Sequence, residues 1–507
     1  MNLLPIPVTP DIAAPLAAID MGSNSFRLEI AQLPRGQYKR QEYLKETVRL
    51  GAGLDEEGML TEAAMQRGLE CLQRFALRLK GFPAARVRAV ATQTLREAKN
   101  RNAFLARAQE ALGYPIEVIS GREEARLIYA GVARLQPSDE PRLVIDIGGR
   151  STEMILGRGR RPASAESFQI GSVSLSMRFF PDGVFTADAF RAAQVAAGAE
   201  LEEALTLFKP ALWQRALGSS GTVGAVAQIL AASGVTDGRI TPEALRWCIE
   251  QCIAAGNMSR IDLLGLKEDR RAVVGGGLCI LYTLLTQFGI TELFPAKGAL
   301  RQGVIFDLVE RLEAARTSDG AAKQDMREAS VEALQKRFAV DLAQAARVQA
   351  TAQSLYKQLA PRAPRERQRE LAWAAALHEM GMMVSHHDHH RHSAYLLAHV
   401  DAAGFSQSQL KRLGDLALGQ RGGLRKLDGI LGDESLLLQL LSLRLAVIKA
   451  HAREAVDSQA LRLKREGKRF TLSLPKSWAL QNPRTAYLLQ EEAAAWARSG
   501  VLELVLA

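Results

Sequence analysis

The stretch that decides the fold reads Ala18-Ile19-Asp20-Met21-Gly22-Ser23-Asn24-Ser25-Phe26-Arg27. An apolar run ends at an aspartate, a turn of glycine and small polar residues follows, and a second apolar run begins. This order is typical of two buried strands joined by a hairpin. The backbone N–H groups of a glycine-containing turn can approach an anion, and a cluster of such donors holds phosphate. Asp20 can hold a hard cation against phosphate oxygens, directly or through water.

The same layout recurs in Val144-Ile145-Asp146-Ile147-Gly148-Gly149-Arg150-Ser151-Thr152-Glu153. A third segment of small residues, Gly218-Ser219-Ser220-Gly221-Thr222, follows Leu217. Taken alone, either of the first two loops is better explained by an ordinary tight hairpin. Three such loops in one chain are hard to explain as turns alone. Together they favour a duplicated nucleotide- or phosphate-binding fold with its site between the two halves.

Further segments strengthen this interpretation, and the chain resembles the exopolyphosphatase and guanosine pentaphosphate phosphohydrolase family over nearly its whole length. The added segments are Ala91-Thr92-Gln93-Thr94-Leu95-Arg96, Ile119 to Ile128, Gly298-Ala299-Leu300-Arg301-Gln302-Gly303, Leu377-His378-Glu379 and His390-Arg391-His392-Ser393-Ala394-Tyr395. The resemblance implies an actin-like (ribonuclease-H-like) ATPase fold in the N-terminal half, with magnesium-dependent release of terminal phosphates. It also implies an added helical region of the HD-phosphohydrolase type.

Two residues depart from the pattern of that family. Arg150 stands where the second loop usually has a third glycine, and its side chain could add a phosphate contact or narrow the loop. Lys297 stands just before Gly-Ala-Leu-Arg, where an acidic residue is common, and it changes the charge balance of that segment.

The organisation of the chain predicts an α/β protein of four domains, for which 507 residues leave room. Two actin-like subdomains are expected at residues 1–135 and 136–310, separated by the polar linker at 136–141. After Arg311 helical periodicity dominates, which predicts a helical HD-like domain at 311–455. Alternating apolar residues at 469–474 and 501–506 predict strands in a small mixed domain at 456–507.

Composition limits the partners and the cellular location. A net charge of +10 and a pI near 9.5 would attract nucleic acid, anionic lipid or polyphosphate. No aromatic-basic strand motif supports nucleic-acid binding, and no apolar stretch is long enough for membrane insertion, although peripheral contact stays open. We expect a cytoplasmic protein with four reduced, structural cysteines. A homodimer is expected from the long members of the family.

Hydrolysis of a phosphoanhydride needs charge neutralisation, an in-line water and a base to orient that water. Asp20 and Asp146 are the expected metal-side carboxylates, with Mg²⁺ as the cofactor and a monovalent cation such as K⁺ as a further candidate. The expected phosphate-binding residues lie in the three loops: Gly22, Ser23, Asn24, Ser25, Gly148, Gly149, Arg150, Ser151, Thr152, Gly218, Ser219, Ser220, Gly221 and Thr222.

The base should be a carboxylate near both Asp-containing loops. Ser120 followed by Glu123 three residues later forms a capping box, which explains Glu123 and leaves Glu124 about 100° away around the helix. In the family the second glutamate of this pair is the catalytic one, which here is Glu124. Glu153 is a second candidate, for water or for metal. Arg96 suits a phosphate clamp, and a salt bridge explains it about as well.

The histidines form a cluster between His378 and His399 that invites a metal-site interpretation. His386 and His390 are four residues apart and could share a helix face. HD-type hydrolases use an adjacent His-Asp pair, whereas here the pair is His378-Glu379. We therefore favour a structural or polyanion-facing role for this cluster.

The leading functional interpretation is an exopolyphosphatase that releases orthophosphate from the end of inorganic polyphosphate. The alternative is the same chemistry on guanosine pentaphosphate, giving the tetraphosphate. The loops do not separate the two, and the net charge and basic C-terminal half favour polyphosphate. A sugar-kinase or chaperone-type ATPase of the same fold is less favoured, because Gly275-Gly276-Gly277 is the only candidate adenosine-binding segment. Intact Asp20, Glu124 and Asp146 argue against a non-catalytic polyanion-binding module.

Overall fold

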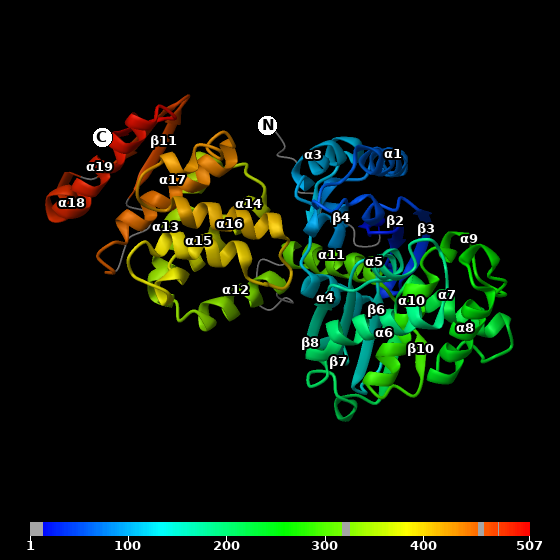
Figure 1. Cartoon of the computed structure of the whole chain (residues 1–507). Helices are drawn as coiled ribbons and strands as arrows, with labels where there is room; N and C mark the ends of the chain where they lie inside the picture. The colour runs from blue at the N-terminus through cyan, green and yellow to red at the C-terminus, as the bar shows by residue number, and fades with distance from the viewer. Residues whose placement is uncertain (1–13, 317–324, 455–460, 475) are drawn as a thin grey trace. The chain divides into compact units, whose positions relative to one another are not determined.

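The computed structural model describes residues 14–316, 325–454, 461–474 and 476–507 (Figure 1). The chain divides into two compact units, Met1–Lys323 and Gln324–Ala507. We call them unit 1 and unit 2 and describe each by itself.

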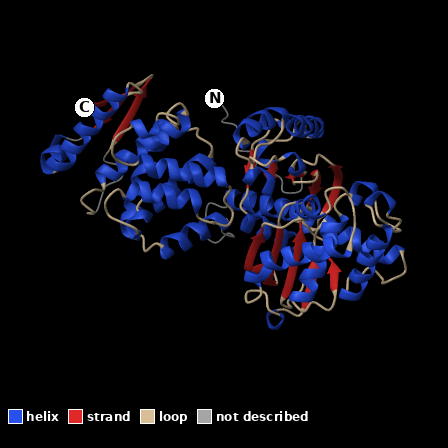
Figure 2. Cartoon of the chain, viewed as in Figure 1, coloured by secondary structure: helices blue, strands red, loops and turns tan. Residues whose placement is uncertain are grey.

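Unit 1 contains two five-stranded mixed sheets (Figure 2). The first has the order β3-β2-β1-β4-β5 and the second the order β10-β9-β6-β7-β8. In each sheet the first three strands in sequence are antiparallel neighbours. The fourth strand pairs parallel with the first, which is central, and the fifth pairs parallel with the fourth. The identical connectivity confirms the duplicated fold expected from the two Asp-containing loops. The strands are β1 (Leu16–Met21), β2 (Phe26–Gln32), β3 (Lys39–Glu46), β4 (Val87–Ala91), β5 (Ile116–Val118), β6 (Arg142–Ile147), β7 (Thr152–Arg158), β8 (Arg161–Phe168), β9 (Arg215–Gly218) and β10 (Leu293–Pro295).

Helices cover both sheets of unit 1, and several match their sequence signals. The helix Arg101–Leu112 ends at Gly113, a typical sequence signal for a helix end, and the φ of 80° at Gly113 is the left-handed conformation that favours glycine there. Thr61 stands at the N-cap of the first long helix, although its side chain makes no capping hydrogen bond. The helices are α1 (Glu62–Arg78), α2 (Gln93–Glu97), α3 (Arg101–Leu112), α4 (Gly121–Leu135), α5 (Ser172–Phe179), α6 (Ala187–Leu201), α7 (Gly221–Ala232), α8 (Pro242–Ala255), α9 (Glu268–Arg271), α10 (Val274–Gln287) and α11 (Leu300–Arg316).

Helices α4 and α11 join the two sheets into one body. Their buried side chains share a hydrophobic cluster with Ala18 and Val90 of the first sheet and with Val144 and Ile155 of the second. Because this core belongs to both halves, the two sheets form one unit. The boundary expected at residue 310 falls inside α11.

Glycines allow α4 and α11 to pack backbone against backbone. A Cβ on Gly303 would lie 1.7 Å from the carbonyl oxygen of Leu127, and one on Gly131 would lie 2.3 Å from the carbonyl oxygen of Ala299. Such distances exclude any larger side chain unless the helices move apart. The segment from Gly298 to Gly303 is therefore required, at least in part, by helix packing.

A buried ion-pair network also ties these helices together. Asp307 on α11 accepts from Arg88 on β4 at 2.7 Å, from Arg126 on α4 at 2.5 Å and from Arg311 at 2.7 Å. These arginines hold the pKa of the Asp307 carboxyl well below its ordinary value, against the opposing effect of burial. Arg126 in turn donates two hydrogen bonds to Glu123. Of the expected capping box, the Ser120 cap is confirmed, whereas the Glu123 carboxylate pairs with Arg126.

Unit 2 is mostly helical, with a small mixed region at its C-terminal end (Figure 2). Its large hydrophobic core contains buried side chains from the helices and from all three strands of the C-terminal sheet. The strands expected near 469–474 and 501–506 are confirmed, and they lie in a three-stranded sheet of order β11-β12-β13. A relation to HD-phosphohydrolases stays a prediction. The elements are α12 (Met326–Arg337), α13 (Leu342–Leu359), α14 (Arg365–Leu377), α15 (His389–His399), α16 (Gln407–Gly419), α17 (Glu434–Lys449), β11 (Arg462–Glu466), β12 (Arg469–Ser473), α18 (Lys476–Gln481), α19 (Pro483–Ser499) and β13 (Glu503–Leu506).

In the part of the chain that the structure describes, no helix combines the length and the apolar character needed to cross a membrane.

The packing of α4 against α11 predicts a large difference between two Gly→Ala variants. Gly303→Ala should lower the free energy of unfolding by about 1–3 kcal/mol, because a methyl group meets a backbone carbonyl. Gly224→Ala, in α7, meets no atom within 4 Å, so it should stabilise by up to about 1 kcal/mol through helix propensity. Chemical denaturation of both variants measures the difference. Equal stabilities would contradict the close packing.

Candidate active site

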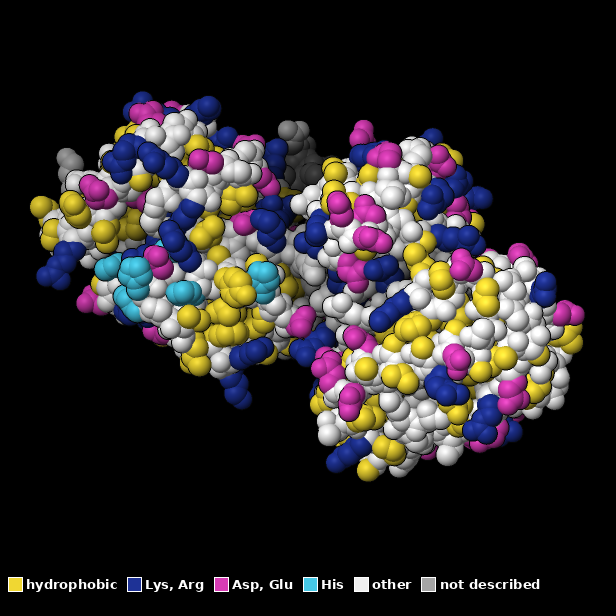
Figure 3. Space-filling model, viewed as in Figure 1, with side chains coloured by type: hydrophobic (Ala, Val, Ile, Leu, Met, Phe, Trp, Pro, Cys, Tyr) yellow, Lys and Arg dark blue, Asp and Glu magenta, His cyan; other side chains and the backbone are white. Residues whose placement is uncertain are grey.

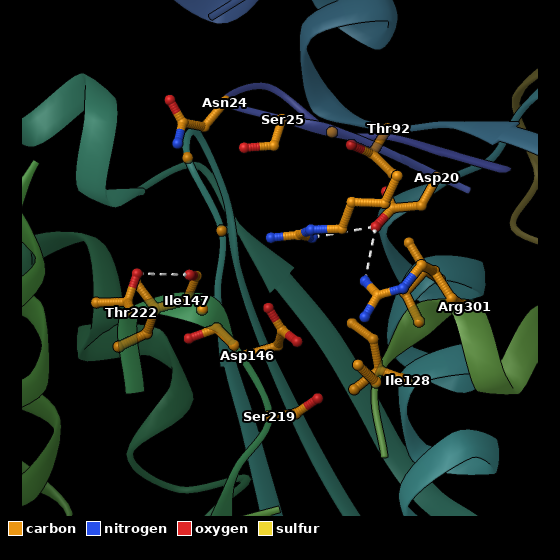
Figure 4. A pocket seen from close by; sticks show the side chains of 18 of the residues that line it. Asp20, Asn24, Ser25, Thr92, Ile128, Asp146, Ile147, Ser219, Thr222 and Arg301 are labelled. Atoms are coloured by element: carbon orange, nitrogen blue, oxygen red, sulfur yellow. Dashed lines mark hydrogen bonds and ion pairs between the residues drawn. The ribbon is translucent and has the colours of Figure 1, made fainter. Parts of the chain in front are cut away.

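A cavity of about 420 Å³ lies within unit 1, where the loops of the two sheets face each other (Figure 4). It is lined by the turn after β1, the turn after β6, the start of α7, and the segment from Ala296 to Gln302. The three loops that the sequence singled out therefore meet at one place. Cavities of about 300–1,000 Å³ are typical for ligands of drug or nucleotide size.

The turn after β1 presents polar atoms that have no partner in the described structure. The Nδ2 atom of Asn24 and the Oγ atom of Ser25 are buried without a hydrogen bond, and both residues line the cavity. Ser23 is held in place because its Oγ accepts from Thr94 at 2.8 Å. Buried polar groups are rarely left unpaired, so the two open groups favour a polar ligand here.

The third loop places the N-terminus of α7 at the cavity. Ser220 caps this helix by accepting from the N–H of Val223, and the hydroxyl of Thr222 donates to the carbonyl of Ile147 at 3.1 Å (Figure 4). The hydroxyl of Ser219 donates to the carbonyl of Gly298 at 2.9 Å. The N-terminus of a helix is a favourable position for phosphate, because free N–H groups and the helix dipole point at it.

Three residues expected to bind phosphate are not among those that line the cavity. The hydroxyl of Thr152 is buried and donates to the carbonyl of Ile170, and Gly218 is the last residue of β9. The side chain of Arg150 binds Glu97 and the carbonyl of Gly51. The other eleven expected phosphate-binding residues all line the cavity.

Asp20 and Asp146 lie in the cavity at the ends of the two central strands (Figure 4). Asp20 pairs with Arg27 at 3.2 Å and with Arg301 at 3.5 Å. Burial raises the pKa of Asp146 to about 6, helped by the negative charge of Asp20 and opposed by the neighbouring Ser219 hydroxyl and the positive charges of Arg27 and Arg301. The negative charges of the two carboxylates therefore repel each other within the cavity, and a cation bound between them would relieve this repulsion.

Glu124 lines the same cavity from the first turn of α4. Burial raises its pKa to about 7, and Asp20 and Asp146 add to the rise, whereas Arg96 opposes it. Arg96 donates to Glu124 Oε2 at 2.8 Å and does not line the cavity. Arg96 is therefore placed as a partner of the candidate base, and a direct phosphate contact stays a prediction.

Glu153, the second candidate base, is only 1% exposed and does not line the cavity. Ser167 donates to its Oε1 at 2.8 Å, and its Oε2 has no partner in the described structure. Burial, together with the charges of Glu124 and Asp146, raises its pKa well above the ordinary value. This position favours Glu124 over Glu153 for contact with a reacting water.

Sequence reasoning did not assign the basic side chains of the cavity wall. Arg27 and Arg301 pair with Asp20, and Lys45 pairs with Asp269. Arg40, Arg270 and Lys297 line the cavity and form no ion pair with a described residue. Arg27, Lys297 and Arg301 lie in or next to segments that the sequence singled out. Arg40, Lys45 and Arg270 come from separate elements that no motif marks.

The residues present fit a magnesium ion that is shared with the substrate. Mg²⁺ is usually held by one or two carboxylates together with substrate phosphates and water. Asp20 and Asp146 supply such a pair. Within the described ranges no three His, Cys, Asp or Glu side chains are arranged to hold a metal by themselves. The monovalent cation expected as a further candidate stays a prediction.

The histidine cluster does not have the geometry that its spacing suggested. Helix α15 begins at His389, so His386 precedes it and the expected shared helix face with His390 is wrong. His378 Nδ1 donates to the carbonyl of Ala375 and Arg421 donates to His389 Nε2. Histidine side chains gather on the face of unit 2 displayed in Figure 3. The four cysteines are free and buried, as expected.

Fold and site together define an enzyme that cleaves phosphoanhydride bonds. A model of the Ppx/GppA phosphatase family matches residues 38–312, and a model of Ppx/GppA phosphatase domain III matches residues 326–493. The chain belongs to the Ppx/GppA phosphatase family.

Relatives and solved structures agree with this assignment. Two proteins from strains of Vibrio cholerae serotype O1, both named guanosine-5'-triphosphate,3'-diphosphate pyrophosphatase, are 37% identical over 95% of this chain and 96% of their own length. An exopolyphosphatase structure from Cytophaga hutchinsonii is 25% identical with a TM-score of 0.53, covering 59% of this chain and 98% of that chain. A structure of an exopolyphosphatase-like protein is 26% identical with a TM-score of 0.55, covering 60% and 99%.

The site predicts that Glu124→Gln abolishes most of the activity. The amide keeps the size of the side chain and loses the base, so kcat should fall by at least ~10²-fold. Glu110→Gln, on the exposed face of α3, is the matched control and should leave kcat unchanged. Phosphate release and circular dichroism measure activity and folding. Near-normal turnover by a folded Glu124→Gln variant would remove Glu124 from the mechanism.

The raised pKa of Glu124 predicts the pH dependence of the reaction. A base must be ionised to accept a proton, so kcat/KM, which reports ionisations of the free enzyme, should rise as pH rises through about 7 and then level off. A bound divalent cation favours the ionised form, so saturating Mg²⁺ should move the rise to lower pH. Values of kcat/KM measured from pH 5 to 9 at two Mg²⁺ concentrations test this. A pH-independent kcat/KM across that range would contradict it.

Proposed function

We propose that this protein hydrolyses guanosine pentaphosphate to guanosine tetraphosphate by removing the terminal 5'-phosphate. The observation that carries the proposal is the 37% identity, over 95% of the chain, to relatives named for this substrate. The sequence favoured polyphosphate on net charge and on the basic C-terminal half. Neither feature separates a nucleotide from a linear polyanion, so the near-full-length similarity weighs more.

The charge pattern of the cavity supports a polyphosphorylated ligand. Arg40, Arg270 and Lys297 face the cavity without a carboxylate partner among the described residues. Burial and the neighbouring charge of Arg27 lower the pKa of Arg270, which is the expected effect on a cation that no adjacent anion fully compensates. A substrate that carries five phosphates would supply the missing negative charge.

The proposed reaction is an in-line attack by water on the terminal phosphorus. The turn from Gly22 to Ser25 and the N-terminus of α7 bind the phosphate oxygens through N–H and hydroxyl groups. Glu124 orients the water and accepts its proton as the oxygen–phosphorus bond forms. The bond between that phosphorus and the bridging oxygen breaks, and its electron pair leaves with the tetraphosphate. Arg96 holds Glu124 in place.

Asp20 and Asp146 would hold Mg²⁺ together with substrate phosphates. When it is bound, Mg²⁺ neutralises negative charge on the phosphates. Arg27 and Arg301, which pair with Asp20, keep that carboxylate turned towards the cavity (Figure 4).

Inorganic polyphosphate is the second candidate substrate. The structural similarity to the Cytophaga hutchinsonii exopolyphosphatase favours it, and the site chemistry on a chain of phosphates would be the same. The basic cavity wall does not distinguish the two substrates.

A competition between substrates tests the proposal. Purified protein with Mg²⁺ is given guanosine pentaphosphate, long polyphosphate or ATP, and kcat/KM is obtained from phosphate release. We expect guanosine pentaphosphate to give a kcat/KM at least about tenfold above polyphosphate, with ATP lowest; tenfold corresponds to about 1.4 kcal/mol of transition-state discrimination. A higher value for polyphosphate would overturn the proposal in favour of the second candidate.

A further inference from the structure

We propose that Arg150 is a positioning residue, which holds the candidate base Glu124 in place through a chain of hydrogen bonds across Glu97, Gln93 and Arg96. The inference rests on the role of Glu124 in the proposed function, and it goes beyond it by assigning a task to a residue that does not line the cavity. We call the series Arg150–Glu97–Gln93–Arg96–Glu124 the relay.

The first link crosses between the two halves of unit 1. Arg150 lies in the turn between β6 and β7, between Asp146 and Glu153 in sequence. Its Nε and Nη2 atoms each lie 2.8 Å from Glu97 Oε2, and its Nη1 donates to the carbonyl of Gly51 at 3.2 Å. The side chains of Arg150 and Glu97 are 21% and 26% exposed, so this pair is partly shielded from water. A glycine at this position could make none of these contacts.

The second link is the amide of Gln93, which is 6% exposed. Its Nε2 donates to Glu97 Oε1 at 2.6 Å, and its Oε1 accepts from Arg96 Nε at 2.9 Å and from Nη2 at 2.5 Å. A carboxylate only accepts and a guanidinium only donates, so the orientation of the amide is fixed on both sides. A flipped amide would oppose both neighbours.

The last link reaches the base. Arg96 Nη1 donates to Glu124 Oε2 at 2.8 Å and to the carbonyl of Ile119 at 3.0 Å. The Arg96 guanidinium therefore hydrogen-bonds to Gln93, Ile119 and Glu124, which together fix its orientation. Because the pairs are partly or wholly buried, a shift of any member passes to the next rather than to solvent.

The relay connects the second phosphate loop to the base in the first half. These two regions also touch directly, since a Cβ on Gly149 would lie 3.1 Å from Ser23 Cβ. Arg150 therefore fixes Glu124 when the loops are together. A misplacement of a catalytic group by about 1 Å can lower a rate by about 10²-fold.

A simpler account is that Arg150 only holds the two halves together through Glu97. The two accounts differ at Gln93, whose side chain hydrogen-bonds to Glu97 and Arg96 and forms no side-chain hydrogen bond with a described residue of the second half. If Arg150 only held the two halves together through Glu97, turnover would not depend on Gln93.

The test compares Arg150→Gly, Gln93→Met and the double variant in the full-length protein with Mg²⁺. If the relay positions the base, each single variant lowers kcat about tenfold with KM changed less than about twofold. The double variant is then no worse than about the lower single variant, because both cut the same chain. Arg150→Lys, which can still donate to Glu97 Oε2, recovers at least about a third of the lost kcat. If Gln93→Met does not fold, Gln93→Leu gives the same readout, whereas Glu97→Gln removes the contact between the two halves as well as the relay and must lower kcat in either account.

Arg160→Gly is the matched control, an exposed arginine in the turn at the other end of β7, and it should leave kcat unchanged. Wild-type kcat in Gln93→Met or Glu97→Gln would overturn the relay. So would an Arg150→Gly variant in which only KM changes, or a double variant whose loss of kcat is the product of the two single losses. Each variant is assayed on guanosine pentaphosphate and on polyphosphate. If the wild-type enzyme prefers polyphosphate, the proposed substrate fails while the relay is still tested on the other.

Discussion

The close packing of α4 against α11 is the constraint on which the site depends. Gly131 and Gly303 let the two backbones meet, and the Asp307 carboxylate binds arginines from β4, α4 and α11 at the same junction. Helix α4 carries the candidate base and α11 carries Arg301, which pairs with Asp20. Both helices pack between the sheets, so one junction sets the distance between the base and the loops of both halves.

The second feature is a set of buried carboxylates that raise one another's pKa. Glu124 and Asp146 each have a raised pKa, because burial disfavours their charge and neighbouring carboxylates add to that effect. Such crowding destabilises the ligand-free site and favours cations within it. It also gives a carboxylate whose pKa of about 7 suits proton transfer at neutral pH. Two arginines and one lysine of the cavity wall form no ion pair among the described residues, and they would contact the substrate phosphates. The carboxylates would bind the cation, so the cavity offers groups of both charges to one metal-bound substrate.

Much of this could be predicted from the sequence, because the informative signals are local. A strand, an aspartate and a glycine-containing turn occur within ten residues, and their repetition predicts a duplicated sheet. The contacts that the local signals did not predict depend on residues distant in sequence. Glu123 pairs with Arg126 in a network centred on Asp307, and Arg150 turns towards Glu97. Arg40 and Arg270 come from unrelated elements, so no motif joins them. The expected helix face of His386 and His390 failed because α15 starts three residues after His386.

The most direct test of the account is a crystal structure of Glu124→Gln with guanosine pentaphosphate and Mg²⁺ bound. The account predicts that the terminal phosphate lies between the turn at Gly22–Ser25 and the N-terminus of α7. A water held by the substituted amide at position 124 would then lie in line with the bond that breaks, and the ion would be bound by Asp20 or Asp146. A nucleotide bound elsewhere in the chain, or a terminal phosphate beyond the reach of the side chain at position 124, would contradict the account.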